Sequence, residues 1–368
     1  MVTNSLPTYK WVQRLGGKFS DTLTAPVGAM WTRGHNPVDK KGIFDVLSNY
    51  VVNTVNNGSE IMMETKAEKL IVENGKAVGV KASKTDGTEV VLHAKKGVIL
   101  ATGGFGANPQ LCAEYNTYWP SIPDDIKTTN ASTSTGDGII MSKEIGANLV
   151  GMGFTQLMPT ANEKTGSLTD ALLVAPQNYI FVNKEGKRFV NEYAERDVLS
   201  WAALSQPDGV FYTIADKDMA LSAQNRPTQE MIDKMVEDKL IYRADTLEGL
   251  ADIIGCDRAT FVNKINKYNS YVKSGTDPEF NKNVFQMEVK NAPFYACPAK
   301  PAIHHTMGGV QINTNGQVID AKGNVIQGLY AAGEVTGGIH AGNRLGGNAI
   351  ADIFVFGRIA GKNAALNK

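Results

Sequence analysis

The sequence predicts a mixed α/β chain, and three observations along its 368 residues support this fold class. Residues 58–100 read as short strands joined by turn residues, and residues 226–275 show apolar side chains at helical spacing. Residues 301–368 return to strand, turn and strand and then end in a helix. We therefore expect a helical insert between two segments that contribute strands to a sheet.

Five strands are expected in the first of these segments, at residues 60–64, 69–72, 77–82, 89–93 and 97–101. The connections Glu73-Asn74-Gly75-Lys76 and Lys84-Thr85-Asp86-Gly87 have the composition of antiparallel hairpin turns. The last strand is apolar on both faces and runs into Thr102-Gly103-Gly104-Phe105-Gly106. This pattern predicts a buried strand that reaches a ligand through a loop without side chains.

The helical segments carry recognisable ends. Asp245-Thr246 can cap a helix over residues 247–254, and a second apolar series at residues 261, 265, 268 and 272 stops at Ser274-Gly275. Near the end of the chain, six glycines between Gly333 and Gly347 separate an apolar strand from a helix that begins at about Asn348. Amides at such a junction can bind a ligand, and a loop shaped only for chain reversal is the alternative.

Composition excludes several classes of function. The 37 basic and 37 acidic residues balance, so nothing indicates an affinity for nucleic acid or for an anionic membrane. No apolar window is long enough to span a bilayer. Cys112, Cys256 and Cys297 lie far apart, which argues against a cysteine metal site and, with the lack of a visible secretory signal, favours the cytoplasm. We expect a small-molecule partner and no bound metal.

Several motifs, taken together and in order, resemble the soluble fumarate reductase flavoproteins of the flavocytochrome c type. They include Ala101-Thr102-Gly103-Gly104-Phe105, Thr135-Gly136-Asp137-Gly138, Arg188-Phe189-Val190-Asn191-Glu192, His304-His305-Thr306-Met307-Gly308-Gly309, Ala332-Gly333-Glu334-Val335-Thr336-Gly337-Gly338 and Asn343-Arg344-Leu345-Gly346-Gly347-Asn348-Ala349. The resemblance implies an FAD-binding domain with a partial central parallel sheet and an antiparallel sheet. A capping domain would interrupt it, with boundaries at 1–153, 154–303 and 304–368.

The same resemblance implies the cofactor contacts. Residues expected to bind FAD are Ala67, Thr102, Gly103, Asp137, His305, Glu334, Ala349 and Ile350. Glu334 would hold hydroxyls of the cofactor, and a solvated loop carboxylate is the alternative. No G-x-G-x-x-G motif follows a strand near the start. We therefore expect the chain to be a fragment of a flavoprotein that holds FAD weakly or not at all.

For the substrate, the resemblance implies that His304 and Arg344 bind one carboxylate and that Gly347 lies beside it. Arg196 matches the family's proton donor to the α-carbon of an α,β-unsaturated acid. The alternative is an ordinary ion pair of Arg196 with Asp197, Glu192 or Glu195.

The sequence departs from the family where the second carboxylate of fumarate would bind. Met158, Ala171 and Leu172 stand where polar groups are expected, and a buried carboxylate without donors costs several kcal/mol. These residues favour an apolar or aryl-substituted acrylate over fumarate. Electrons would come from a separate haem, flavin or NADH module. A non-catalytic fragment without cofactor and a ketosteroid dehydrogenase-like enzyme remain as alternatives.

Overall fold

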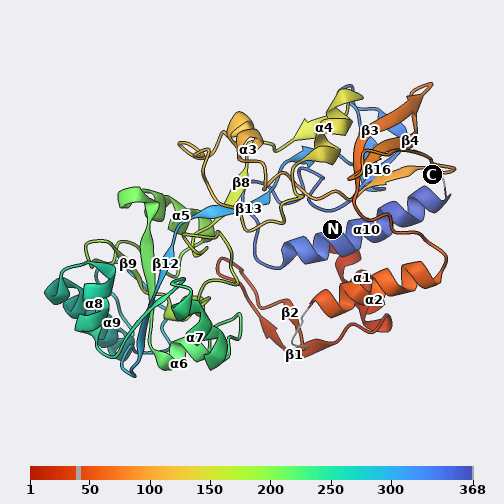
Figure 1. Cartoon of the computed structure of the whole chain (residues 1–368). Helices are drawn as coiled ribbons and strands as arrows, with labels where there is room; N and C mark the ends of the chain where they lie inside the picture. The colour runs from red at the N-terminus through yellow and green to blue at the C-terminus, as the bar shows by residue number, and fades with distance from the viewer. Residues whose placement is uncertain (39–42, 367–368) are drawn as a thin grey trace. The chain divides into compact units, whose positions relative to one another are not determined.

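The structure is a computed structural model that describes residues 1–38 and 43–366 (Figure 1). It divides into two compact units. Unit 1 contains residues 1–122, 132–155 and 305–368, and unit 2 contains residues 123–131 and 156–304. The chain passes between them in β8 (Thr155–Met158) and again in β13 (Ala302–Thr306). The domain boundaries expected from sequence, 153/154 and 303/304, fall near these two strands, whereas the assignment of residues 123–131 to unit 2 was not anticipated.

Unit 1 is built on a mixed sheet in the order β15-β16-β4-β3, with β5 beside β4 and β6 beside β16. The strands are β3 (Thr65–Glu73), β4 (Lys76–Lys84), β5 (Glu89–His93), β6 (Val98–Leu100), β15 (Gln317–Ile319) and β16 (Val325–Ala331). β6 and β16 are parallel, with Tyr330 opposite Ile99, whereas β3, β4 and β5 are antiparallel. The expected combination of parallel and antiparallel strands is confirmed.

The β3–β4 hairpin follows from its turn residues. Asn74 and Gly75 both have positive φ, at +50° and +75°, as a two-residue turn of the type favoured by Asn-Gly requires. The strand expected at residues 60–64 is wrong, because β3 begins only at Thr65. Ile61 and Met63 are exposed and Glu64 has a φ of +51°, so these apolar side chains have no sheet face to cover.

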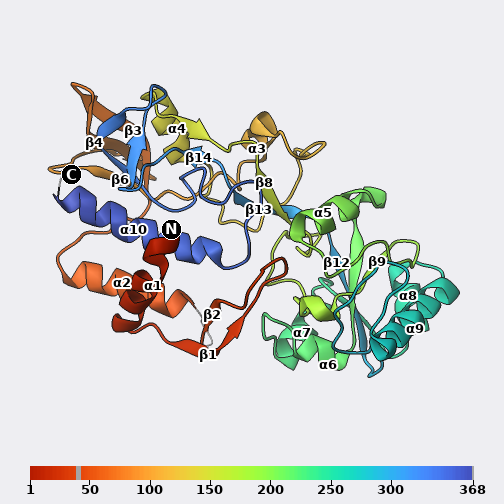
Figure 2. The same ribbon diagram turned by 180° about the vertical axis from the view of Figure 1, so that it is seen from behind.

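The remaining elements of unit 1 include a long helix that packs on the sheet. The helices are α1 (Val2–Arg14), α2 (Ile43–Asn56), α3 (Pro109–Tyr115), α4 (Asp137–Glu144) and α10 (Asn348–Leu366), and two small ladders pair β1 (Phe19–Thr24) with β2 (Gly34–Pro37) and β7 (Leu149–Val150) with β14 (Gly309–Val310). α10 lies against β16 and β6 and contacts α1, as both views show (Figures 1 and 2). Its buried face, with Val355, Phe356 and Ala360, packs against Tyr330.

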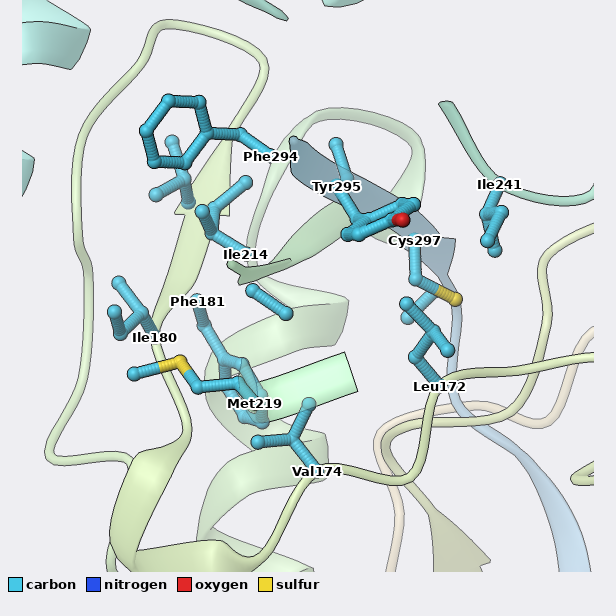
Figure 3. Close-up of a cluster of buried hydrophobic side chains, with 14 of the residues drawn as sticks. Leu172, Val174, Ile180, Phe181, Ile214, Met219, Ile241, Phe294, Tyr295 and Cys297 are labelled. Carbon is cyan, nitrogen blue, oxygen red and sulfur yellow. The ribbon is translucent and has the colours of Figure 1, made fainter. Parts of the chain in front are cut away.

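Unit 2 contains an antiparallel sheet in the order β11-β12-β10-β9, surrounded by helices. The strands are β9 (Phe181–Asn183), β10 (Phe211–Ala215), β11 (Tyr242–Ala244) and β12 (Phe294–Ala299), and the helices are α5 (Arg196–Leu204), α6 (Lys217–Leu221), α7 (Gln229–Glu237), α8 (Leu247–Ile254) and α9 (Arg258–Ser274), with short 3₁₀ turns at Pro176–Asn178 and Pro207–Gly209. Thr246 caps α8 by accepting from Gly249 N, and Gly255 ends the helix in the left-handed conformation. A single apolar core lies between sheet and helices (Figure 3).

None of the helices in the described ranges combines the length and the apolar character needed to cross a membrane.

Candidate active site

The glycine loop that follows β6 runs tightly over two polar side chains of unit 1. The N–H of Phe105 donates to Thr306 Oγ1 at 3.2 Å. A Cβ on Gly104 would collide with the Thr306 hydroxyl and with the Glu334 carboxylate. Gly103 has a φ of +73°, which favours glycine. The loop predicted to reach a ligand therefore also needs glycine for its own close packing.

Three residues expected to bind the cofactor come together around the start of α4. A Cβ on Gly138 would collide with the Thr102 hydroxyl, so Thr102 lies directly against this helix. Asp137, the first residue of α4, accepts from Thr135 Oγ1 at 3.0 Å and lies 3.6 Å from Lys66 Nζ. Ala67 follows Lys66 in β3, the strand on which α4 packs. The fold thus gathers Ala67, Thr102 and Asp137 from distant parts of the sequence.

Glu334 is held by hydrogen bonds from Thr306, the last residue of β13. Its Oε1 accepts from the N–H of Thr306 at 2.9 Å and from Thr306 Oγ1 at 3.0 Å, and its Oε2 lies 3.7 Å from His305 Nε2. Burial raises the pKa of Glu334, and the bonds from Thr306 and the charge of Arg344 oppose that shift. The side chain is 21% exposed, so Glu334 is a partly buried carboxylate that is held by hydrogen bonds from Thr306.

The glycine-rich loop ends where α10 begins. Gly347 has a φ of +86°, and a Cβ placed there would meet no atom within 4 Å. Ala349 and Ile350 follow in the first turn of this 19-residue helix, whose N-terminal amides and dipole favour an electron-rich group. Arg344 is buried at 8% exposure, and its Nη1 donates to Leu345 O at 3.3 Å.

Arg196 is the first residue of α5 in unit 2 and is partly buried. Its Nη1 donates to Gln156 Oε1 at 3.3 Å. Burial lowers the pKa of Arg196, opposed only by the nearby Tyr179. Among the described residues no carboxylate forms an ion pair with Arg196, and Glu192, one of the partners considered, binds Arg188 instead. The ion-pair alternative for Arg196 therefore has no support in the structure.

A buried charge cluster immediately precedes Arg196. We use the name Arg188 cluster for Arg188, Glu192, Asp277 and Lys282, whose side chains are all 0% exposed. Arg188 donates to both oxygens of Glu192 at 2.7 Å and to Asp277 Oδ2 at 2.8 Å. Lys282 donates to Tyr179 O at 2.6 Å. The cluster anchors the segment that leads into α5.

The other predicted substrate residues of unit 2 have separate surroundings. His304 lies in β13, with Nδ1 2.7 Å from Thr129 Oγ1. Met158 ends β8 and is 9% exposed. Ala171 and Leu172 are each 1% exposed within the core, where Leu172 lies beside Cys297 (Figure 3). The Leu172 side chain is part of that core. Contact of Leu172 with a substrate therefore stays a prediction.

Two residues of unit 1 were not anticipated from the sequence. His340 Nε2 lies 3.1 Å from Asp352 Oδ2, and their side chains are only 5% and 2% exposed. Neither residue stands out in its own segment, because α10 carries other polar residues and His340 lies in a loop of glycines. In addition, no group of three or more His, Cys, Asp or Glu side chains within the described ranges is arranged to hold a metal ion.

Comparison with known families decides the class of this domain. The family model described as FAD binding domain matches residues 3–350. This chain belongs to the FAD binding domain family.

Relatives of this FAD binding domain carry the names of oxidoreductases. The NADH:acrylate oxidoreductase of Vibrio harveyi is 50% identical over 368 residues, which are 99% of this chain and 36% of the relative. A solved structure of the open conformation of a flavocytochrome c3 fumarate reductase is 36% identical, with a TM-score of 0.81, and covers 99% of this chain and 63% of its own. The chain thus spans roughly one to two thirds of these two proteins. The structure of a 3-ketosteroid Δ1-dehydrogenase from Sterolibacterium denitrificans is 23% identical to this chain and has a TM-score of 0.72. The match covers 89% of this chain and 64% of the dehydrogenase, and at this identity it indicates a shared fold only.

The residues of unit 1 in this FAD binding domain fit a flavin dinucleotide. Gly347 leaves open space at the start of a long helix, where a side chain would otherwise stand. Glu334 offers a buried carboxylate oxygen suited to accept from hydroxyl groups. The loop at Gly103 brings backbone without side chains to the same part of the unit. These features, and not the family name alone, make the cofactor assignment chemically reasonable.

Proposed function

We propose that this chain is the FAD-binding and substrate-binding part of a reductase that saturates the carbon–carbon double bond of an α,β-unsaturated carboxylate. The observation that carries the proposal is Arg196, a partly buried arginine that donates to Gln156 but forms no ion pair with a carboxylate among the described residues. Withdrawing a cation from water without a counter-charge costs free energy. Such a cost is expected where the cation meets an anionic substrate or gives up a proton.

The cofactor would be held by unit 1. Glu334 binds hydroxyls of FAD, while Thr102, Gly103 and Asp137 line its path and Ala67 contacts it through the backbone. When bound and reduced, FAD supplies a hydride for the β-carbon of the substrate. The amides at Ala349 and Ile350, at the start of α10, would favour an electron-rich group of the bound cofactor.

Arg196 supplies the proton that completes the reaction. Addition of hydride at the β-carbon leaves an electron pair at the α-carbon, which is basic enough to take a proton even from a guanidinium. The proton passes from Arg196 to the α-carbon and forms the second new C–H bond, and Arg196 then regains a proton from solvent. Burial lowers the pKa of Arg196 and so favours this transfer.

Arg344 and His304 are the residues that we propose bind the substrate carboxylate. A planar guanidinium suits a carboxylate because its donors form a fixed fork. The bond between His304 Nδ1 and the Thr129 hydroxyl sets the orientation of the imidazole ring. Gly347 leaves room beside the start of α10 for the bound acid.

An apolar acid is the preferred substrate in this proposal. Met158, Ala171 and Leu172 are apolar where a dicarboxylic acid would need donors, and a relative of this chain is named for acrylate. We therefore favour acrylate or an alkyl- or aryl-substituted acrylate over fumarate. Because the same relative is named for NADH, we also propose that the electrons come from NADH. They would reach the flavin through a part of the protein outside this chain.

We further propose that the isolated chain binds FAD weakly. The sequence contains no G-x-G-x-x-G turn after a strand near its start, and that turn normally holds the pyrophosphate. Isothermal titration with FAD tests this point. A submicromolar dissociation constant would contradict it.

The test of the function uses the chain saturated with FAD and reduced viologen as electron donor. Oxidation of the viologen is followed with acrylate, cinnamate, crotonate and fumarate. We expect kcat/KM for a monocarboxylate to exceed that for fumarate by at least tenfold. Turnover of none of the four acids would contradict the proposal, and fumarate as the best substrate would contradict the apolar wall.

A further inference from the structure

A buried histidine–aspartate pair in unit 1 lies next to a predicted cofactor contact. His340 Nε2 and Asp352 Oδ2 are 3.1 Å apart, and both side chains are almost fully buried. A carboxylate accepts hydrogen bonds, so Nε2 of His340 is the donor of this bond. The other carboxylate oxygen, Oδ1, is buried and has no hydrogen-bond partner among the described residues. The hydrogen bond to His340 is thus the only one that this carboxylate accepts within those ranges.

The backbone around His340 is held in an uncommon conformation. Gly338 has a φ of +82°, and Ala341, which is not a glycine, has a φ of +51°. A left-handed alanine is disfavoured and persists only where the surrounding structure imposes it. The loop therefore directs the His340 ring inward toward α10 at a conformational cost.

The pair reaches the cofactor residues through a second histidine. The rings of His340 and His305 meet edge to face, with centroids 5.4 Å apart and planes at 84°. His305 Nε2 in turn lies 3.7 Å from Glu334 Oε2. Asp352, His340, His305 and Glu334 therefore form one continuous buried series of contacts.

We propose that Asp352 and His340 are positioning residues of the flavin site. Asp352 fixes the orientation of the His340 ring, and the edge-to-face contact between the two rings holds His305 for its contact with the cofactor. The inference rests on the proposed function, because His305 is a cofactor contact only if FAD binds unit 1. Neither Asp352 nor His340 needs to touch FAD for this role.

The test measures the histidine rings first without cofactor and then with it. The chain has five histidines, so selective ¹⁵N labelling of histidine gives a small set of ring signals by NMR. We expect Asp352→Asn and His340→Gln each to shift the ring signals of His305. As a matched control, Val355→Ala creates a cavity at a buried position of the same helix and should leave His305 unchanged. Two variants are used so that the test still stands if one of them fails to fold. Circular dichroism shows whether each variant is folded.

Titration with FAD then follows the same signals. We expect FAD to shift His305 in the parent chain and to bind Asp352→Asn at least tenfold more weakly, with Val355→Ala near the parent. Unmoved His305 signals in the folded variants, or equal FAD affinity, would overturn the inference. If FAD at its solubility limit shifts no histidine of the parent, the cofactor assignment of unit 1 is wrong, and the measurements without cofactor still decide whether the pair positions His305.

Discussion

Removal of Arg188 tests how far one buried side chain supports unit 2. The Arg188 cluster contains two cations and two carboxylates, all fully buried, so its formal charges cancel. Arg188→Met deletes three hydrogen bonds of 2.7–2.8 Å. Glu192 and Asp277 then keep only backbone donors and the charge of Lys282, whose Nζ lies 3.9 Å from Glu192. Breaking a buried ion pair from one side costs about 3–5 kcal/mol. We expect a loss of unfolding free energy in this range.

Urea unfolding followed by circular dichroism measures this loss. Arg258→Met is the matched control, because Arg258 forms its ion pair with Asp252 on the surface of the same unit. We expect little change for the control, since exposed ion pairs are screened by solvent. The reasoning would be refuted if Arg188→Met lowered the unfolding free energy by less than about 1 kcal/mol, or by no more than Arg258→Met does. Either result would show that removal of Arg188 does not leave uncompensated charge in the interior.

Two further predictions concern pH and substrate binding. Burial lowers the pKa of Lys282 to about 8, below its ordinary 10.5. Between pH 8 and 10 the unfolded chain therefore holds a proton that the folded chain has lost, so this group makes stability rise with pH, by at most about 1.4 kcal/mol per pH unit. Lys282→Met should remove that rise in unfolding free energies measured from pH 7.5 to 10, and an unchanged slope would contradict the assignment. Arg344→Met should raise KM for the enoate and lower kcat, with poor rescue by Lys because Lys lacks the planar fork; full rescue by Lys in steady-state kinetics would show that only charge matters there.

The sequence predicts the elements whose signals are local. The hairpin between β3 and β4 forms where Asn74-Gly75 predicts it, and α8 has the bounds expected from Thr246 and from its apolar spacing. Both depend on residues a few positions apart. The false strand at residues 60–64 shows the limit of such signals, since strand-like composition without a partner strand does not form a ladder.

The contacts that depend on distant residues could not be predicted in this way. Arg188 pairs with Glu192 within its own motif, but Asp277 is 89 positions away and no spacing rule links them. The sheet of unit 2 likewise pairs β10 with β12, with Ala215 opposite Tyr295, which is 80 positions further along the chain, and no local signal predicted this pairing. The cofactor residues of unit 1 were named only through family resemblance, and the His340–Asp352 pair was missed because neither residue stands out in its own segment.

The central claim is that Arg196 delivers the proton during reduction of an enoate. Single-turnover oxidation of the FAD-saturated, pre-reduced protein by an unsaturated monocarboxylate tests it most directly. We expect Arg196→Ala to slow this oxidation roughly 10²–10⁴-fold, the usual worth of a general acid. Arg243→Ala, which removes an exposed arginine paired with Asp233 in the same unit, should leave the rate unchanged. Oxidation of Arg196→Ala at the parent rate would contradict the claim and assign the proton to another group.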